Sequence, residues 1–144
     1  MQISAILASK GNFVATIHPE AQVSELVTAL SEHSVGALIV STDGLSISGI
    51  VSERDVVRAL TSGPQVLTAQ VASIMTSQVH VATPDTHVDD LTIMMTERRI
   101  RHVPVTDSAG YIVGIVSIGD IVKTRLSELE EERTALMEYI NRGG

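Results

Sequence analysis

The sequence contains neither cysteine nor tryptophan, and its only aromatic residues are Phe13, Tyr111 and Tyr139. Without cysteine there are no disulfides, no thiolate metal site and no cysteine nucleophile, and a reducing cytoplasm is the simplest location. The near absence of aromatic rings also bears on ligands. A planar ligand would have to be held by aliphatic side chains and backbone groups rather than by aromatic stacking.

Long apolar runs and an excess of cations are also missing. No apolar run approaches the roughly 18 residues that a membrane span needs, and residues 1–6 lack the pattern of a signal peptide. Ten Lys and Arg against 17 Asp and Glu give a net charge of −7, which disfavours nucleic-acid binding. We therefore expect neither membrane nor nucleic acid as a partner. With 44% apolar residues, the 144 residues are typical of one ordinary globular domain or two very small ones.

One stretch of the chain recurs 65 residues later without a gap. Residues 47–58 are ISGIVSERDVVR, and residues 112–123 are IVGIVSIGDIVK. A shorter echo precedes each copy, with residues 3–7 similar to residues 71–75. Further upstream the identical pairs are Pro19/Pro84, Val23/Val88, Leu26/Leu91, Glu32/Glu97 and Val40/Val105. Chance would leave only a few identities at one offset, so the sequence indicates a tandem duplication.

Each copy is predicted to form a strand, an amphipathic helix, two further strands and a second helix. In the first copy we expect strands at 14–17, 37–40 and 47–51, a helix with Val23, Leu26, Val27 and Leu30 on one face, and a helix carrying Val56, Val57 and Leu60. In the second copy we expect strands at 79–82, 102–105 and 111–116, a helix with Val88, Leu91, Met94 and Met95, and a helix carrying Ile121, Val122 and Leu126. The methionines are interpreted as core residues rather than an interaction surface.

A unit of about 60 residues is too small to bury much core alone. The predicted fold is therefore α+β, with two tandem repeats packed as a pseudo-twofold pair. We assign residues 1–65 to the first repeat and 66–126 to the second, with Gly63 and Pro64 in the linker. Residues 127–144 form a C-terminal helix that covers the chain's own core or docks on another subunit.

The element Gly-x-x-Ser-x-x-Asp occurs twice where a strand is followed by a helix, ending at Asp55 and at Asp120. Free N–H groups and a serine hydroxyl at a helix N-terminus suit a phosphate, and a carboxylate one turn later suits ribose hydroxyls. The same spacing is also that of a capping box, with Ser52 and Ser117 as N-caps. Spacing alone leaves both interpretations open.

Residues 98–102, RRIRH, are the most basic stretch of this acidic chain. This stretch lies where a predicted helix ends and a strand begins. Basic residues there indicate either an anion site or a solvated helix end whose cations oppose the helix dipole. The five histidines show no spacing typical of metal ligands, so no metal is expected. No P-loop, nucleophile elbow or nucleophile–base pattern is present, and we predict that the protein is not an enzyme.

Taken together, these motifs resemble a tandem pair of CBS domains, the cystathionine β-synthase type module, over about residues 2–126. The chain is most similar to stand-alone bacterial CBS-pair proteins. The resemblance implies a non-catalytic regulatory module that binds AMP, ADP, ATP or NAD(H), or in some members S-adenosylmethionine, between the repeats. It also implies a homodimer and a regulated protein partner that the sequence does not identify. The segments that carry it are 16–20 (TIHPE), 49–55 (GIVSERD), 73–76 (SIMT), 101–105 (RHVPV) and 114–120 (GIVSIGD).

The resemblance also assigns roles to residues of the two clefts. The ribose would be held by Asp55 or Asp120, with Ser52 or Ser117 at the phosphate or ribose. The predicted adenine slots consist of Thr16, Ile17, Ala37 and Leu38 in the first cleft, and of His80, Val81, His102, Val103 and Pro104 in the second. The phosphate candidates are Arg54, Arg101 and His102. Only the second copy joins local cations to the Ser–Asp pair, so we expect unequal clefts.

Two alternatives belong to other classes of protein. In one, the clefts have lost their ligand and the chain is a structural or oligomerisation protein. In the other it is an enzyme, which the missing catalytic patterns disfavour. Retention of both Asp55 and Asp120 favours ligand binding over loss of the ligand.

Overall fold

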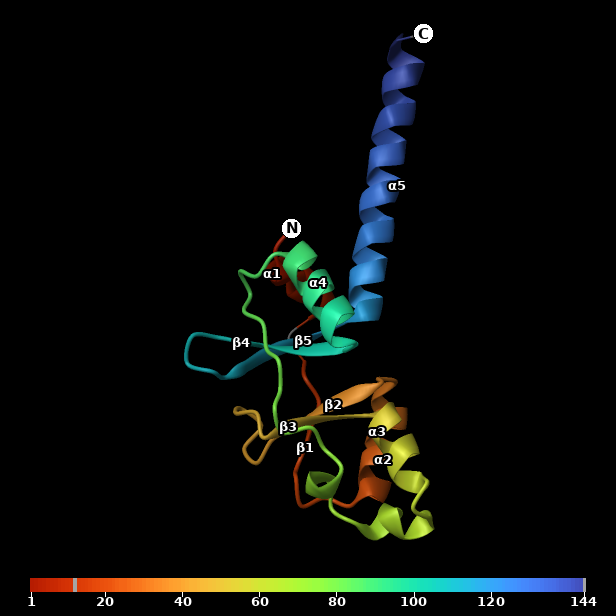
Figure 1. Cartoon of the computed structure of the whole chain (residues 1–144). Helices are drawn as coiled ribbons and strands as arrows, with labels where there is room; N and C mark the ends of the chain where they lie inside the picture. The colour runs from red at the N-terminus through yellow and green to blue at the C-terminus, as the bar shows by residue number, and fades with distance from the viewer. Residues whose placement is uncertain (12, 144) are drawn as a thin grey trace.

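The computed structural model describes residues 1–11 and 13–143. Two α+β units are stacked with their sheets toward the middle and their helices on the outside (Figure 1). The first unit contains β1 (Thr16–Ile17), α2 (Val23–His33), β2 (Ala37–Val40), β3 (Gly49–Ser52) and α3 (Glu53–Leu60). The second contains α4 (Val88–Arg98), β4 (His102–Thr106), β5 (Ile112–Ser117) and α5 (Ile118–Gly143). Outside these lie α1 (Ile3–Lys10) and two short 3₁₀ helices, η1 (Pro64–Thr68) and η2 (Val71–Ser73).

The first unit follows the predicted order of elements. β1 runs parallel to β2, and β3 runs antiparallel to β2. The register places Thr16 opposite Ile39 and Ala37 opposite Ser52. Because all four residues of β2 are buried, this central strand contributes to the core along its whole length.

The second unit departs from the prediction at its first strand. Instead of a strand over 79–82, the structure has a single parallel bridge between Ala82 and Val105. Pro104 occupies the position that corresponds to Ile39, and proline has no N–H to donate to a neighbouring strand. The ladder therefore cannot extend beyond Ala82 toward residue 79, and the second sheet consists of the antiparallel pair β4 and β5.

A short segment precedes each repeat in the sequence. Each segment packs against the core of the other repeat and not against the repeat that follows it. Ile3, Ile6 and Leu7 of α1 lie in the core of the second unit. Val71 of η2 lies in the core of the first, with Ile74 and Met75 packed against it. The echo between residues 3–7 and 71–75 is thus an exchange of two equivalent segments, and the helix at 3–10 was not predicted.

The core residues confirm the helix spacing only in part. Val23, Leu26 and Leu30 of α2 are buried, as are Leu91 and Met95 of α4. Other members of the predicted apolar faces are exposed instead: Val27, Val57, Leu60, Val122 and Leu126. One layer of sheet can bury only one side of each helix, so these residues form outward-facing apolar strips.

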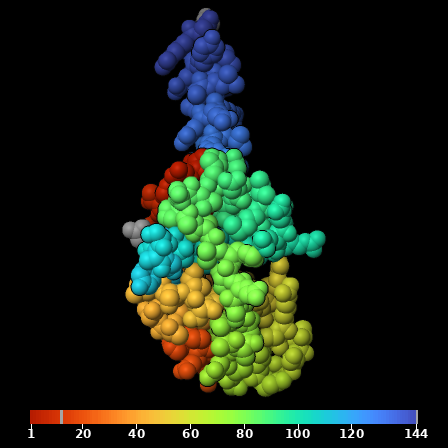
Figure 2. Space-filling model, turned by 60° about the vertical axis from the view of Figure 1, so that its left-hand side comes forward, coloured from red at the N-terminus to blue at the C-terminus, as the bar shows by residue number. Residues whose placement is uncertain are grey.

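The C-terminal helix and the second helix of the second repeat are one continuous helix, α5. Near the body, Ile121 is buried, and the Arg125 guanidinium pairs with Asp89 of α4 and with Glu128. Beyond that point α5 extends away from both units (Figures 1 and 2). All described residues from Leu129 to Gly143 are exposed. The free part of α5 therefore covers none of the chain's own core.

Candidate functional site

A serine–aspartate pair lies at the strand–helix junction of each unit, as the duplicated motif predicts. In the first unit, Asp55 Oδ2 accepts hydrogen bonds from the Ser52 N–H at 2.8 Å and the Ser52 hydroxyl at 3.1 Å. In return, the Asp55 N–H donates to Ser52 Oγ at 3.4 Å, which completes a capping box. Capping therefore occurs, and it still leaves Asp55 Oδ1 without a hydrogen bond from the described residues.

In the second unit, the corresponding pair has a third member. Asp120 Oδ2 accepts from the Ser117 N–H at 2.8 Å, and the Asp120 N–H donates to Ser117 Oγ at 3.1 Å. The Lys10 ammonium donates to the same Asp120 oxygen at 2.7 Å and to the Ile115 carbonyl at 2.7 Å. A residue from the start of the chain thus forms an ion pair with the carboxylate of the second repeat.

His102 connects the two units. It lies opposite Ser117 in the ladder of β4 and β5, as Ala37 lies opposite Ser52 in the first unit. A Cβ added to Gly36 would be 3.3 Å from the His102 ring and 3.4 Å from the Glu53 carboxylate. The imidazole of the second unit therefore reaches the β2–α3 region of the first, and the glycine leaves the space for it.

Burial keeps His102 neutral, and its neighbours keep Asp120 ionised. Burial lowers the pKa of His102, and the charge of Lys10 lowers it further, against the opposing effect of Asp120 and Glu53. Burial by itself would raise the pKa of Asp120, but hydrogen bonds from Lys10 and Ser117 outweigh it, so this pKa is lowered. Near pH 7 the cleft of the second repeat thus offers a carboxylate, an ammonium and an uncharged imidazole.

The residues expected to line the adenine slots differ in exposure. Thr16 and His102 are half-buried, whereas the other strand residues are buried: Ile17, Ala37, Leu38, Val103 and Pro104. Leu38 and Val103 belong to the two hydrophobic cores. They can reach a ligand only through their backbone groups, since their side chains are already packed.

The remaining predicted residues lie at the surface. Val81 and His80 are exposed, and His80 Nε2 is 3.4 Å from the guanidinium of Arg98. Arg54 on α3 and Arg101 before β4 are also exposed. Neither arginine forms an ion pair within the described part of the chain, so both guanidinium groups are available to an anion.

Sequence reasoning missed Lys10 and Glu53, which lie beside the predicted residues. Glu53 directly follows Ser52 in the motif, and a neighbour of a motif residue could have been considered. Lys10 had a weaker signal, namely its place just after the echo at residues 3–7. Only the packing of α1 on the second unit brings it to Asp120.

A hollow of about 520 Å³ lies between α2 and α3, and Gly36 and Glu53 line one end of it. Over residues 1–11 and 13–143, no three His, Asp or Glu side chains are gathered as metal ligands. No helix within those ranges has both the length and the apolar content needed to cross a membrane.

The comparisons with known proteins agree with the duplicated architecture. The family model described as CBS domain matches twice, over residues 10–62 and 71–127. The chain is 37% identical over 126 residues to the CBS domain-containing protein CBSX3, mitochondrial, of Arabidopsis thaliana. That alignment covers 84% of this chain but 61% of the Arabidopsis protein, so the chain spans less than two thirds of this relative.

Two solved structures show the same fold. The CBS-domain containing protein ATU1752 from Agrobacterium tumefaciens has a TM-score of 0.83 at 36% identity, with 87% of this chain and 99% of that chain covered. The CBS domain pair of protein MJ0100, solved in complex with 5′-methylthioadenosine and S-adenosyl-L-methionine, has a TM-score of 0.80 at 26% identity. It covers 89% of this chain and 98% of its own. This chain belongs to the CBS domain family and is built from two tandem CBS repeats.

Proposed function

We propose that the chain is a regulatory module that binds an adenosyl ligand, of the class AMP, ADP, ATP or NAD(H), between its two CBS repeats. It performs no chemistry on the ligand and passes the bound state to a partner protein. The observation that carries this proposal is the duplicated Ser–Asp pair at a strand–helix junction. In each pair one carboxylate oxygen has no hydrogen bond from the described residues and is available as an acceptor.

The chemistry of these groups fits the sugar and the base. A carboxylate at such a junction accepts hydrogen bonds from vicinal ribose hydroxyls. The adenine ring would lie against strand backbone and the half-buried side chains of Thr16 or His102. The complex of the MJ0100 pair with two adenosyl compounds supports the same class of ligand here.

The exposed cations support a phosphorylated member of that class. Arg101 directly precedes His102 at the second cleft, and Arg54 lies between Ser52 and Asp55 at the first. A guanidinium group binds phosphate oxygens through paired, charge-assisted hydrogen bonds. The neutral imidazole of His102 adds a donor or an acceptor but no charge.

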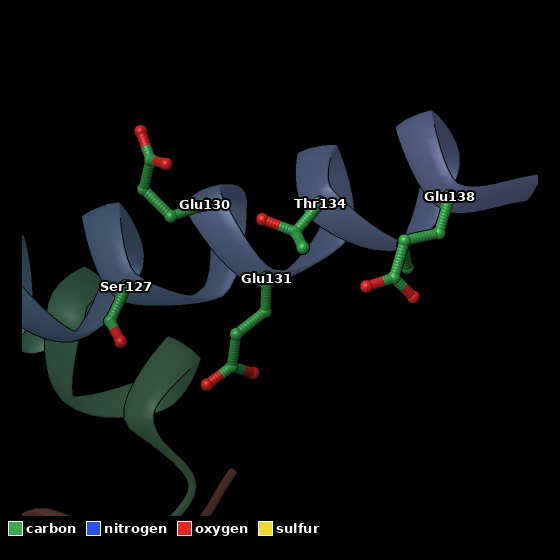
Figure 3. A pocket seen from close by; sticks show the side chains of 6 residues that line it. Ser127, Glu130, Glu131, Thr134 and Glu138 are labelled. Carbon is green, nitrogen blue, oxygen red and sulfur yellow. The ribbon is translucent and has the colours of Figure 1, made fainter. Parts of the chain in front are cut away.

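The assembly that we propose is a homodimer. Along α5, residues follow the alternating four- and three-residue spacing of a two-stranded coiled coil, with Arg133 at one position of this stripe. The apolar members are Val122, Leu126, Leu129, Leu136 and Ile140. Each is more than half exposed. The other sides of the helix carry Glu130, Glu131 and Glu138, as the close view shows (Figure 3). A second copy that packs on the apolar stripe removes it from water and leaves the acidic side solvated.

Charge complementarity favours a parallel arrangement of these two helices. In the heptad defined by the stripe, Arg125 and Glu130 occupy the flanking positions that meet across a parallel pair. Arg125, which pairs with Asp89 and Glu128 of its own copy, then also faces Glu130 of the other.

Mass spectrometry of small molecules released from the purified protein tests the ligand directly. A panel of AMP, ADP, ATP, NAD(H) and 5′-methylthioadenosine in thermal unfolding then ranks the candidates. We expect an adenine nucleotide to raise the unfolding temperature, since a ligand that binds only the folded state stabilises it. GMP serves as the control for the base. If no adenosyl compound is released or shifts the transition, the chain is a structural or oligomerisation protein instead.

A further inference from the structure

The two carboxylates of the Ser–Asp pairs differ in one neighbour, the ammonium of Lys10. Residues 59–97 contain no Lys or Arg, so the segment that packs on the first unit brings no such cation. Lys10 instead ends α1, whose Leu7 lies 2.5 Å from where a Cβ on Gly114 would be. This packing fixes the end of α1 beside β5 and directs the ammonium to Asp120.

The hydrogen bonds around Asp120 leave two groups open. An ammonium has three hydrogens, and two of those on Lys10 are donated to Ile115 O and Asp120 Oδ2. Asp120 Oδ2 is fully used, whereas Asp120 Oδ1 accepts no hydrogen bond from residues 1–11 and 13–143. The Lys10 and Asp120 side chains are 36% and 23% exposed, so solvent or a ligand can reach them. One N–H donor and one carboxylate acceptor are thus presented next to each other.

These groups match a ribose phosphate better than a ribose alone. A sugar hydroxyl can donate to Asp120 Oδ1 without disturbing the ion pair, and an anionic oxygen can accept from the free N–H of Lys10. A neutral 5′ substituent gains nothing from the ammonium. Arg101, which directly precedes His102 in the chain, is a second exposed cation of this repeat.

We propose that Lys10 binds the 5′-phosphate of the ligand and makes the second repeat's cleft select phosphorylated adenosyl ligands over neutral ones such as 5′-methylthioadenosine. This inference rests on the proposed function, because it assumes that Asp120 holds the ribose. It goes further by assigning a specificity-determining residue from outside both sequence repeats.

Calorimetric titrations of the full chain with AMP and with 5′-methylthioadenosine test the assignment. The two probes share the adenine and the ribose and differ at the 5′ position. We expect Lys10→Met to weaken AMP binding about tenfold, the value of one charge-assisted hydrogen bond, and to change 5′-methylthioadenosine binding less than about twofold. Lys123→Met, which removes an exposed cation on α5, is the control for net charge.

Asp120→Asn separates a phosphate contact from an indirect effect through the carboxylate. It is expected to weaken both probes by a similar factor, and Lys10→Met in that background still lowers the preference for AMP. Lys10→Gln, a second variant that keeps a polar side chain, gives the same result as Lys10→Met if the charge is what matters. Circular dichroism and the unfolding temperature of each variant establish that it is folded.

The outcomes separate the two proposals. If the wild type binds neither probe and no other adenosyl compound of the panel, the proposed function fails. If AMP binds but Lys10→Met leaves the ratio of the two affinities unchanged, the function stands and the assignment of Lys10 is wrong. A loss of preference for AMP that Lys123→Met does not reproduce supports it.

Discussion

The two CBS repeats carry the same Ser-x-x-Asp element, yet the carboxylates of the two elements have different partners. Among residues 1–11 and 13–143, Asp55 forms side-chain hydrogen bonds with Ser52 alone, the N-cap of its own helix. Asp120 has the equivalent backbone bond and, in addition, the ammonium of Lys10 at 2.7 Å. Both copies thus have the motif, and the exchange of the preceding segments brings a cation to the carboxylate of the second copy.

The strand beside each motif increases the difference. Ala37 lies opposite Ser52, whereas His102 lies opposite Ser117 and extends over Gly36 into the other repeat. The position opposite the serine is therefore aliphatic in the first repeat, and in the second it carries an imidazole. We therefore expect the second repeat to be the stronger nucleotide site, and the following experiments test this expectation.

The largest expected effect is on ligand binding. At about 100 times its dissociation constant, a ligand adds roughly 2.7 kcal/mol of stability, an increase of about 10 °C in unfolding temperature for a chain of this size. Asp120→Ala removes the ribose acceptor of the stronger cleft and should abolish most of the shift that AMP produces. Asp55→Ala should retain most of it. Differential scanning fluorimetry with and without AMP measures both.

Each variant also loses the carboxylate that accepts the serine N–H in its Ser–Asp pair, a hydrogen bond that contributes about 1 kcal/mol in either repeat. The shift must therefore be taken relative to each variant without ligand. The ranking of the clefts is wrong if Asp55→Ala abolishes the AMP shift and Asp120→Ala retains it.

The motif glycines provide a comparison of packing. A Cβ on Gly49 would lie 2.7 Å from the backbone oxygen of Thr76, which also accepts a hydrogen bond from Ile50. The three atoms nearest to a Cβ on Gly114 all belong to the Leu7 side chain. Overpacking costs about 1–3 kcal/mol, and Gly49→Ala should fall at the upper end because a bonded backbone moves less easily than a side chain. Urea unfolding of both variants tests this, and an equal loss would show that Leu7 is as rigid as the backbone.

A deletion that shortens α5 would make the second helices of the two repeats similar in length. α3 ends at Leu60, whereas α5 continues to Gly143 with an exposed apolar stripe. Removal of residues 127–144 should raise the dissociation constant of the proposed dimer by at least about tenfold, because most of the stripe is lost. Light scattering across a concentration series measures this. AMP affinity should stay within about twofold, and a larger loss in a shortened chain that is still dimeric would place the tail in the site.

Local pattern predicted much of this molecule. The order of strands and helices and the Ser–Asp junctions follow from residue spacing and from the 65-residue offset, which aligns equivalent positions. Burial of Leu26 and Leu91 also follows, because both lie on the apolar face of a helix. These features depend on contacts within one repeat, where sequence distance and spatial distance agree.

What the pattern could not predict depends on contacts between distant segments. The exchange that places Lys10 beside Asp120 spans 110 residues, and no periodicity encodes it. The loss of the strand at 79–82 depends on Pro104 in the neighbouring strand rather than on residues 79–82 themselves. The exposure of Val57 and Val122 reflects how much helix surface a thin sheet can cover.

The smallest expected effect concerns stability and pH. Hydrogen bonds from Lys10 and Ser117 hold the pKa of Asp120 below the ordinary value of an aspartate. The pair therefore stabilises the fold fully above that ordinary pKa, and its contribution is lost as pH falls through the lowered pKa. Because both side chains are partly exposed, Lys10→Met should cost less than about 1 kcal/mol at pH 7.

At pH 3 the cost should shrink, since this pH is below the ordinary pKa of an aspartate and the unfolded chain then takes up a proton that the ion-paired Asp120 resists. Urea unfolding at both pH values gives the difference between wild type and variant, with Lys123→Met as the control for net charge. The comparison at pH 7 is made where His102 is already neutral, because burial and Lys10 lower its pKa. A cost that is the same at both pH values would mean that Lys10 acts through the packing of α1, and the charge asymmetry between the repeats would then contribute nothing to stability.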